Sequence, residues 1–214
     1  MSEVTSLRKV TIVDLEIQNI LSVTNAFQII GAQVNVVRDA AGVGDADFLV
    51  LPGVGAYGNA AERLHASGVG AAIREHALRK RLPLMGLCLG MQLLAEGSEE
   101  YGFHAGLGLI PGRVVRLEDA PPAFRVPNIG WREVVLTAHS ALLPRSLSGC
   151  SFYHVHSFHL QCAQASDLAG ESQFGSAKIA SIVHHANVFG TQFHPEKSQD
   201  AGLDLLHAVL QGLR

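Results

Sequence analysis

A cysteine between two glycines is the residue of this 214-residue chain best suited to covalent chemistry. The segment GLCLG (86–90) follows the apolar run Pro83–Leu87 and precedes a helical pattern over 89–96. G-x-nucleophile-x-G at a strand-to-helix junction is the nucleophile-elbow pattern, here with Cys88 in place of serine. The helix N-terminus favours a thiolate, and the backbone N–H of Leu89 would donate to an oxyanion. The five residues alone also fit a buried structural cysteine between two packing glycines.

A histidine and a glutamate near the C-terminus are the candidate partners of this cysteine. His194 closes the strand-like run Val188–Phe193 and is followed by Pro195 and Glu196. Residues two apart in an extended chain project to the same side, so we expect Glu196 to orient the His194 ring, with the proline making that relation rigid. Cys88, His194 and Glu196 are therefore a candidate catalytic triad. Taken alone, His-Pro-Glu also fits an ordinary strand end.

A group of histidines raises the separate question of metal binding. His154 and His156 would face one side of a strand, with His159 nearby, and His184 and His185 could add nitrogen ligands for a divalent metal. No carboxylate cluster accompanies them to complete a coordination shell. We therefore expect no metal site and no cofactor.

Composition and charge narrow the class of protein. Hydrophobic residues make up 48% and charged residues 16%, as in a folded globular chain, and a net charge of −3 without basic clusters argues against a nucleic-acid partner. The N-terminus is too polar for a signal peptide, and no apolar run approaches the roughly 20 residues of a membrane span. Three cysteines without a CxxC pair indicate a reducing compartment. We expect a cytoplasmic protein that does not engage membranes.

Alternating patterns in the first half place Cys88 at the end of a buried strand. Short apolar runs, of the length expected for buried parallel strands, alternate with stretches of helical periodicity, which indicates a parallel sheet covered by helices on both faces. Glycines at 68 and 70 are expected to interrupt the helical stretch over 59–81. The expected strands are Val10–Val13, Val34–Val37, Phe48–Leu51 and Pro83–Leu87, and the expected helices cover 20–30, 59–81 and 89–96.

The second half indicates antiparallel structure. Five prolines divide it into short segments with strand-like alternation, which suit hairpins better than further βα units. Because no linker divides the chain, we expect a single α/β domain over 1–214, with a mostly parallel central sheet flanked by helices and an antiparallel extension. The expected strands are Val114–Leu117, Glu133–Leu136, Phe152–Leu160, Lys178–Val183 and Val188–Phe193, followed by an amphipathic helix with Leu203, Leu206, Leu210 and Leu213 on one side.

Two longer stretches resemble a known family. GLCLGMQ (86–92) and GTQFHPEKS (190–198) are similar to the two signature stretches of triad-type, or class I, glutamine amidotransferases, and the resemblance covers essentially the whole chain. It implies that Cys88 attacks the side-chain carbonyl of glutamine while His194 moves protons. A glutamyl thioester forms, ammonia leaves, and water releases glutamate.

Four further segments narrow the resemblance within that family. PGVG (52–55), PNIGW (127–131), YHVHSF (153–158) and the Lys-Ser pair at 197–198 are similar to the glutaminase subunits of imidazole glycerol phosphate synthase, an enzyme of histidine biosynthesis. This implies a heterodimer whose other subunit, a TIM-barrel cyclase, uses the ammonia to make imidazole glycerol phosphate and a purine-pathway carboxamide (AICAR). An independent reason for a partner is that the glutaminase occupies the whole chain, which leaves nothing to bind an ammonia acceptor.

The resemblance also assigns expected roles to individual residues. Gln92 and Glu100 match positions that hold the amide and amino ends of glutamine. Tyr153, Ser157 and Phe158 match the wall of the substrate pocket, and Asn19, Trp131 and Lys197 match the face towards the cyclase.

An oxyanion hole needs two N–H donors, and Leu89 supplies one of them. We expect the second from the turn around Val54 and Gly55. Glycines on both sides of Val54 make rotation of a peptide unit inexpensive there. The free subunit is therefore expected to hold this donor turned away, and a partner loaded with its own substrate to favour the rotated form.

The chain departs from the family pattern near the expected interface, and this leaves alternatives open. The segment EIQN (16–19) lacks the usual glycine-containing turn, Asn128 replaces a common histidine, and Arg132 replaces a common asparagine. A paralogue that feeds ammonia to a sugar-modifying partner is one alternative. A binding module without chemistry and a cysteine peptidase on a related fold are two others.

Overall fold

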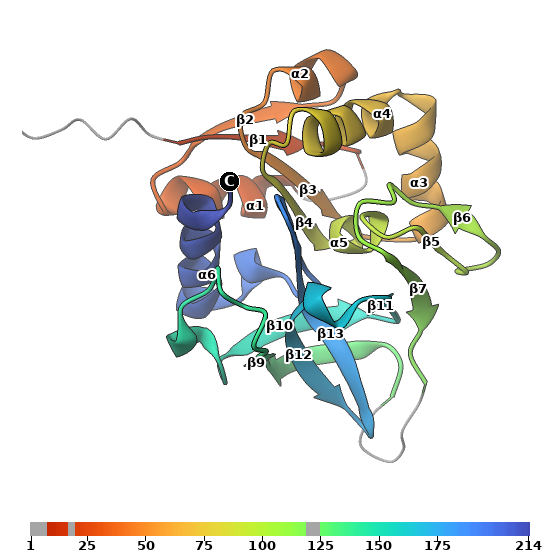
Figure 1. The fold of residues 1–214 in the computed structure, drawn as a ribbon, viewed down its shortest axis with the longest axis vertical. Helices are drawn as coiled ribbons and strands as arrows, with labels where there is room; N and C mark the ends of the chain where they lie inside the picture. The colour runs from red at the N-terminus through yellow and green to blue at the C-terminus, as the bar shows by residue number, and fades with distance from the viewer. Residues whose placement is uncertain (1–7, 17–19, 119–124) are drawn as a thin grey trace, which may run out of the picture.

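An eight-stranded mixed sheet organises the chain in the computed structural model, which describes residues 8–16, 20–118 and 125–214 (Figure 1). The strand order is β2-β1-β3-β4-β14-β13-β12-β9, in which the first five strands are parallel and the last three continue the sheet in antiparallel fashion. This confirms the expected fold class. The strands of this sheet are β1 (Lys9–Val13), β2 (Gln33–Val37), β3 (Leu49–Gly53), β4 (Leu84–Cys88), β9 (Val135–Leu136), β12 (Leu168–Phe174), β13 (Ala177–His185) and β14 (Val188–Thr191).

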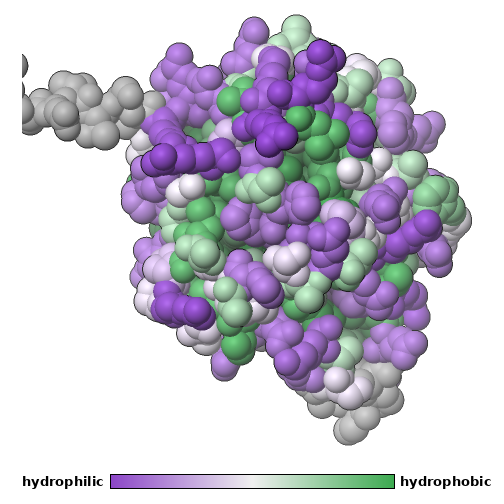
Figure 2. Space-filling view, in the orientation of Figure 1, coloured by the Kyte–Doolittle hydropathy of each residue, from purple (hydrophilic) through white to green (hydrophobic). Residues whose placement is uncertain are grey.

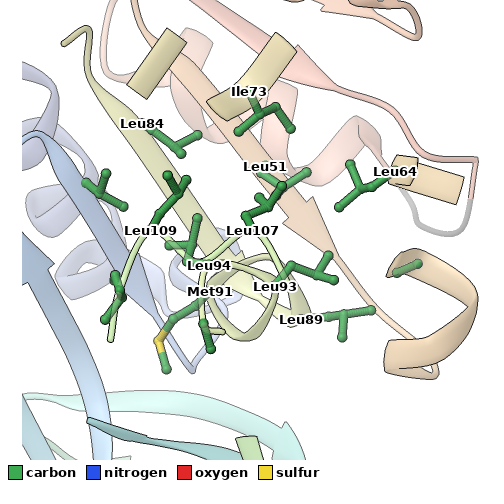
Figure 3. Close-up of a cluster of buried hydrophobic side chains, with 14 of the residues drawn as sticks. Leu51, Leu64, Ile73, Leu84, Leu89, Met91, Leu93, Leu94, Leu107 and Leu109 are labelled. Carbon is green, nitrogen blue, oxygen red and sulfur yellow. The ribbon is translucent and has the colours of Figure 1, made fainter. Parts of the chain in front are cut away.

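Helices cover both faces of the parallel part of the sheet (Figure 1). Successive strand residues point to opposite faces, so in β3 Leu51 packs with the helices on one side and Val50 with those on the other. Figure 3 shows the first side, where Leu51 lies among Leu64 and Ile73 of two covering helices. The first side is covered by α2 (Ala40–Gly44), α3 (Tyr57–Ala66), α4 (Val69–Arg74) and α5 (Leu89–Leu93), and the second by α1 (Ile20–Ile29) and α6 (Gln199–Gly212).

Two smaller sheets carry the strands that lie beside Cys88. One pairs β8 (Asn128–Glu133) with β10 (Ser151–His156), and the other has the order β11-β7-β5-β6. The expected single strand Phe152–Leu160 is therefore wrong: it is broken at Ser157, because β10 pairs with β8 whereas β11 pairs with β7. The strands of the second sheet are β5 (Gly97–Ser98), β6 (His104–Ala105), β7 (Gly112–Arg116) and β11 (Phe158–Cys162).

Several other expectations need correction. The strand expected at Val34–Val37 is present as β2, but it is the half-exposed edge of the sheet because it pairs only with β1. The helical stretch over 59–81 is interrupted at Gly68, where φ is +72°, while Gly70 lies inside α4, which a π-helical turn (Glu75–Arg79) prolongs. The helix expected over 89–96 ends at Leu93, because the chain turns over residues 94–96 and continues into β5, which pairs with β7. The strand β12 was not expected, because its sequence shows no clear alternation of apolar and polar residues.

Exposed hydrophobic residues form small separate areas among hydrophilic ones on the face drawn in Figure 2. None of the helices in the described residues is long and apolar enough to cross a membrane.

Candidate active site

Cys88 is the last residue of β4 and immediately precedes α5, at the strand-to-helix turn expected from its sequence. Its φ of 53° and ψ of −111° are unusual for a residue with a side chain, and such strain concentrates at functional sites. The flanking glycines are needed for space. A Cβ on Gly90 would lie 1.7 Å from the Leu51 carbonyl oxygen, and one on Gly86 would lie 2.7 Å from the Met91 nitrogen. The tight turn holds the Cys88 thiol at the edge of a cavity, with 5% of the residue exposed.

His194 and Glu196 form a buried pair beside this turn. His194 Nδ1 donates to Glu196 Oε1 at 2.7 Å, and each side chain is about 95% buried, with exposed fractions of 4% and 5%. The extended geometry expected for this segment is wrong, because residues 195–197 form a 3-10 turn. The turn is held on both sides: the His194 N–H donates to the Tyr153 carbonyl at 2.9 Å, and the Ser198 hydroxyl donates to the His194 carbonyl at 2.6 Å.

The charge state of His194 depends on its neighbours. Burial alone would lower its pKa, but the negative charge of Cys88 and the hydrogen bond and charge of Glu196 raise the pKa to about 10. Because Glu196 occupies Nδ1, the other ring nitrogen, Nε2, is the one available to a substrate. Nε2 is buried and has no hydrogen-bond partner among the described residues. The site can therefore hold an imidazolium next to a thiolate, the pair that a cysteine nucleophile uses.

Cys88 and His194 line one cavity of about 290 Å³. Its walls come from the two βα junctions after β3 and β4 and from the break between β10 and β11. The volume is close to the lower end of the range for small-molecule sites. The cavity is lined by Val54, Gly55, Cys88, Leu89, Gln92, Glu100, Pro127, Val155, His156, Ser157, Phe158 and His194.

Four of the five expected substrate-binding residues line the cavity, and Tyr153 does not. Gln92 and Glu100 line the cavity, and Glu100 Oε2 also accepts a 2.8 Å hydrogen bond from the Tyr57 N–H. Ser157 and Phe158 form the wall at the break between two strands. Tyr153 is not among the lining residues: its carbonyl accepts from the backbone of His194, and its ring meets Trp131 edge-on at a centroid distance of 6.1 Å.

The expected oxyanion segment lies directly opposite the elbow. Gly53 ends β3 in register with Cys88, and a Cβ on Gly53 would lie 3.1 Å from the Gly90 nitrogen. Val54 and Gly55 follow and line the cavity together with Leu89, and Gly55 has a φ of +95° that favours glycine. The role of these backbone N–H groups stays a prediction.

The expected partner-facing residues lie on the surface beside the cavity. Trp131 on β8 is 44% exposed, and Lys197 is exposed one residue beyond Glu196. Lys197 lines a second cavity of about 180 Å³, which shares Val54 and His194 with the first. Asn19, also expected on this face, lies outside the described residues.

The central histidines are held by hydrogen bonds. Burial, followed by the charge of neighbouring His154, lowers the pKa of His156 to about 3, and burial lowers that of His154 to about 4. His156 Nδ1 donates to the Phe158 carbonyl at 2.9 Å, and Nε2 accepts from Asn128 Nδ2 at 3.0 Å. Arg132 Nε donates to Asn128 Oδ1 at 2.8 Å. Two of the residues that depart from the family pattern are therefore hydrogen-bonded to each other.

These histidines do not form a metal centre in the part of the chain that the structure describes. No group of three or more potential metal-ligating side chains occurs there. His185, which was considered as an additional ligand, pairs instead with Asp167 at 2.9 Å.

Sequence reasoning missed Gln192, which is fully buried beside the nucleophile. Its Nε2 atom lies 3.9 Å from Cys88 Sγ, and its Oε1 accepts from Gln92 Nε2 at 3.0 Å. The available signal was its position two residues before His194, within the signature stretch GTQFHPEKS.

The site and the sheet together define a class of protein, and comparison with known proteins agrees. Residues 11–208 match the sequence model of the family described as glutamine amidotransferase class-I, and the chain belongs to that family. Its relatives include the imidazole glycerol phosphate synthase subunit HisH 2 of Nitrobacter winogradskyi, 38% identical over 96% of this chain and 99% of that protein. Subunit HisH of Sulfurimonas denitrificans is 42% identical over 92% of this chain and 95% of that protein. The narrower resemblance predicted from the motifs is thus confirmed.

Solved structures agree on the fold. The structure described as PurLQS from Thermotoga maritima has a TM-score of 0.73 at 19% identity, covering 97% of this chain and 100% of that one. A crystal structure of a glutamine amidotransferase has a TM-score of 0.71 at 19% identity, covering 95% of this chain and 98% of that one. At this level of identity the likeness concerns the fold alone.

Proposed function

We propose that this chain is the glutaminase subunit of an imidazole glycerol phosphate synthase, which hydrolyses glutamine at Cys88 and passes ammonia to a cyclase subunit. The observation that carries the proposal is that His194, which is held by a 2.7 Å hydrogen bond to buried Glu196, lines one cavity with a cysteine at a nucleophile elbow. The resemblance to HisH subunits over nearly the whole chain supports the same assignment.

The first half-reaction forms a thioester. The Cys88 thiolate attacks the side-chain carbonyl carbon of glutamine, and the carbonyl oxygen becomes an oxyanion. The N–H of Leu89 and a second N–H from Val54 or Gly55 stabilise it. His194 then donates the Nε2 proton to the amide nitrogen, the C–N bond breaks, and ammonia leaves.

The second half-reaction restores the enzyme. His194, now neutral, takes a proton from a water molecule, which attacks the thioester carbonyl carbon. The C–S bond breaks, glutamate is released, and the imidazolium–thiolate pair re-forms. Glu196 stays ionised throughout and keeps the His194 ring in the tautomer that directs Nε2 at the substrate.

Polar groups that line the cavity supply the selection of glutamine. Gln92 Nε2 donates to the Phe158 carbonyl and to Gln192 Oε1, so only Gln92 Oε1 is left to accept from a substrate N–H. The Glu100 carboxylate, which lines the same cavity, suits the positive α-amino group of glutamine. Ser157 and Phe158 close the wall between them.

A second subunit would cover the exposed side of the site. The cavity lined by Lys197 shares Val54 and His194 with the glutamine pocket, and this adjacency supports an exit for ammonia on the Lys197 side. Trp131 is an exposed aromatic of the kind that anchors interfaces, and Lys197 adds an exposed cation beside the site. We propose a TIM-barrel cyclase in a cytoplasmic heterodimer, with 1–214 as one amidotransferase domain.

The test reconstitutes the chain with a cyclase subunit of a HisH-type synthase and compares two nitrogen sources. Cys88→Ala should abolish glutamine-dependent product formation and leave ammonia-dependent formation unchanged. Cys150→Ala, which removes a half-buried thiol outside the cavity, is the matched control and should leave both intact. Glutamate release by Cys88→Ala at a rate comparable with the unmodified chain would refute the proposal.

A further inference from the structure

The buried amide of Gln192 joins two parts of the site that are remote in sequence. Gln192 follows β14, and its N–H donates to the Ser181 carbonyl at 2.9 Å, which extends the pairing of β14 with β13 and fixes the backbone. The side chain lies with Nε2 3.9 Å from Cys88 Sγ and Oε1 3.0 Å from Gln92 Nε2. A fully buried amide held at both ends has no freedom to turn to solvent.

The direction of each hydrogen bond in this chain follows from one fixed acceptor. The Phe158 carbonyl can only accept, so the Gln92 atom 2.9 Å from it must be the amide nitrogen. That nitrogen also faces the Gln192 side chain, so the Gln192 atom opposite it must be the carbonyl oxygen. The Gln192 nitrogen is therefore the atom that faces Cys88, and it can only donate.

A donor in this position favours one state of the sulfur. A thiolate accepts an amide N–H well, whereas a thiol or thioester sulfur accepts weakly. The interaction is therefore strongest when Cys88 is poised for attack and again when it leaves the thioester. The charged or titratable side chains that line the cavity with Cys88 are Glu100, His156 and His194. Because burial lowers the pKa of His156 to about 3, this ring is neutral, and the positive charge near the sulfur comes from His194.

We propose that Gln192 is a further catalytic residue, whose amide N–H stabilises the Cys88 thiolate and whose carbonyl oxygen fixes the substrate-facing oxygen of Gln92. This inference rests on the proposed glutaminase function. Gln192 thus links the ionisation of Cys88 to the position of Gln92, which binds the substrate. A displacement of Gln92 would also move the Gln192 N–H that donates to Cys88.

Gln192→Glu separates the two halves of the role. Glutamate keeps the length of the side chain and an acceptor for Gln92 Nε2, but it places oxygen instead of N–H against the sulfur. Gln192→Met removes the donor without adding charge and is the second variant if the buried glutamate prevents folding. Gln173→Glu makes the same chemical change on an exposed side chain of β12 and is the matched control.

The readout is the rate at which iodoacetamide alkylates Cys88 as a function of pH, measured by mass spectrometry of the peptide that contains it. A hydrogen bond to a charged group is worth roughly 1.5–3 kcal/mol, so the midpoint should move to higher pH in Gln192→Glu and Gln192→Met, and alkylation at pH values below the midpoint should fall about 10- to 100-fold. In a Cys88→Ala background, Gln192→Glu should change glutamine affinity less than about threefold, because its acceptor for Gln92 remains.

Alkylation profiles of folded Gln192 variants that superimpose on those of the unmodified chain and of Gln173→Glu would overturn the proposal. Alkylation by iodoacetamide needs no glutamine turnover, so this result is separate from the proposed function. A chain that shows the Gln192 effect on Cys88 but never releases glutamate would retain the thiolate role and refute the glutaminase.

Discussion

Glu196 Oε1 lies 2.7 Å from His194 Nδ1 although the two residues are joined by a 3-10 turn and not by extended backbone. Proline at position 195 starts this turn, and Ser198 closes it by donating to the His194 carbonyl. The hydrogen bond within the pair is thus set locally by residues 194–198, while the pairing of β14 with β4 brings the pair to the strand that ends in Cys88. This makes the histidine–carboxylate unit a separately testable part of the site.

Replacing Glu196 should impair catalysis less than replacing the residues that exchange bonds or protons. In Glu196→Gln the amide offers the same acceptor but no charge to stabilise the imidazolium, so kcat should fall about 10- to 1000-fold. Cys88→Ala and His194→Ala should each lose roughly a thousandfold or more. Steady-state glutamate release measures all three, and an undiminished kcat in Glu196→Gln would contradict the role of the carboxylate.

Stability should fall as the pH decreases from about 6.5 towards 4. His154 and His156 have folded-state pKa values of about 4 and 3, below the ordinary 6.5, because burial disfavours their charged forms. In this range the unfolded state binds more protons, so the free energy of unfolding decreases by up to ~1.4 kcal/mol per pH unit for each histidine. Urea unfolding at a series of pH values measures the slope. In His156→Gln the contribution of one histidine is removed, so the slope should be smaller by up to ~1.4 kcal/mol per pH unit. An unchanged slope would contradict this account.

The tautomer of His156 should depend on Asn128. The Asn128 amide donates to Nε2, which leaves the proton on Nδ1 for the Phe158 carbonyl. An aspartate cannot donate, so in Asn128→Asp the ring must carry a proton on Nε2, and retaining the bond to Phe158 then requires the charged form. Nitrogen-15 NMR of the ring should show the Nδ1–H tautomer at neutral pH in the unmodified chain and in the exposed control Asn35→Asp. An identical ring spectrum in Asn128→Asp would show that this hydrogen bond does not set the tautomer.

Gly90→Ala should prevent the elbow from forming. A Cβ there would meet the Leu51 carbonyl oxygen at 1.7 Å, and since both partners are backbone, neither can move aside cheaply. We expect destabilisation of several kcal/mol or loss of soluble protein. Gly44→Ala is the control, because an added Cβ at Gly44 meets nothing within 4 Å. A melting temperature of Gly90→Ala equal to that of the control would rule out this packing argument.

Glutamine turnover should depend on the partner. Val54 and Gly55 form the turn after β3, where a peptide rotation would bring a second donor to the oxyanion. The chain alone should release glutamate slowly, and turnover should rise by one or more orders of magnitude when the cyclase and its own substrate are added. Equal rates in the two conditions would contradict this control of the oxyanion hole by the partner, but they would not contradict the assignment of the triad.

The parallel core was predicted from the sequence, and Cys88, His194 and Glu196 were singled out as a candidate triad, because both depend on local patterns. Buried parallel strands are continuous apolar runs, and an elbow needs glycine at two fixed positions. The break at Ser157 was missed because the strand-like sequence pattern continues across it. What separates β10 from β11 is that they pair with different strands, and the choice of partner strand is not a local property of the sequence. Gln192 was missed for a related reason: its partners, Cys88 and Gln92, are about a hundred residues away in sequence.

Direct observation of the covalent intermediate tests the central claim. The chain is mixed with glutamine and its reconstituted cyclase, quenched in acid during turnover, digested, and analysed by mass spectrometry. We predict that the peptide containing Cys88 carries one glutamyl group as a thioester, that the modification disappears when glutamine is exhausted, and that the peptides containing Cys150 and Cys162 stay unmodified. Continued release of glutamate with no acyl group on Cys88 at any quench time, together with full activity of Cys88→Ala, would contradict the account.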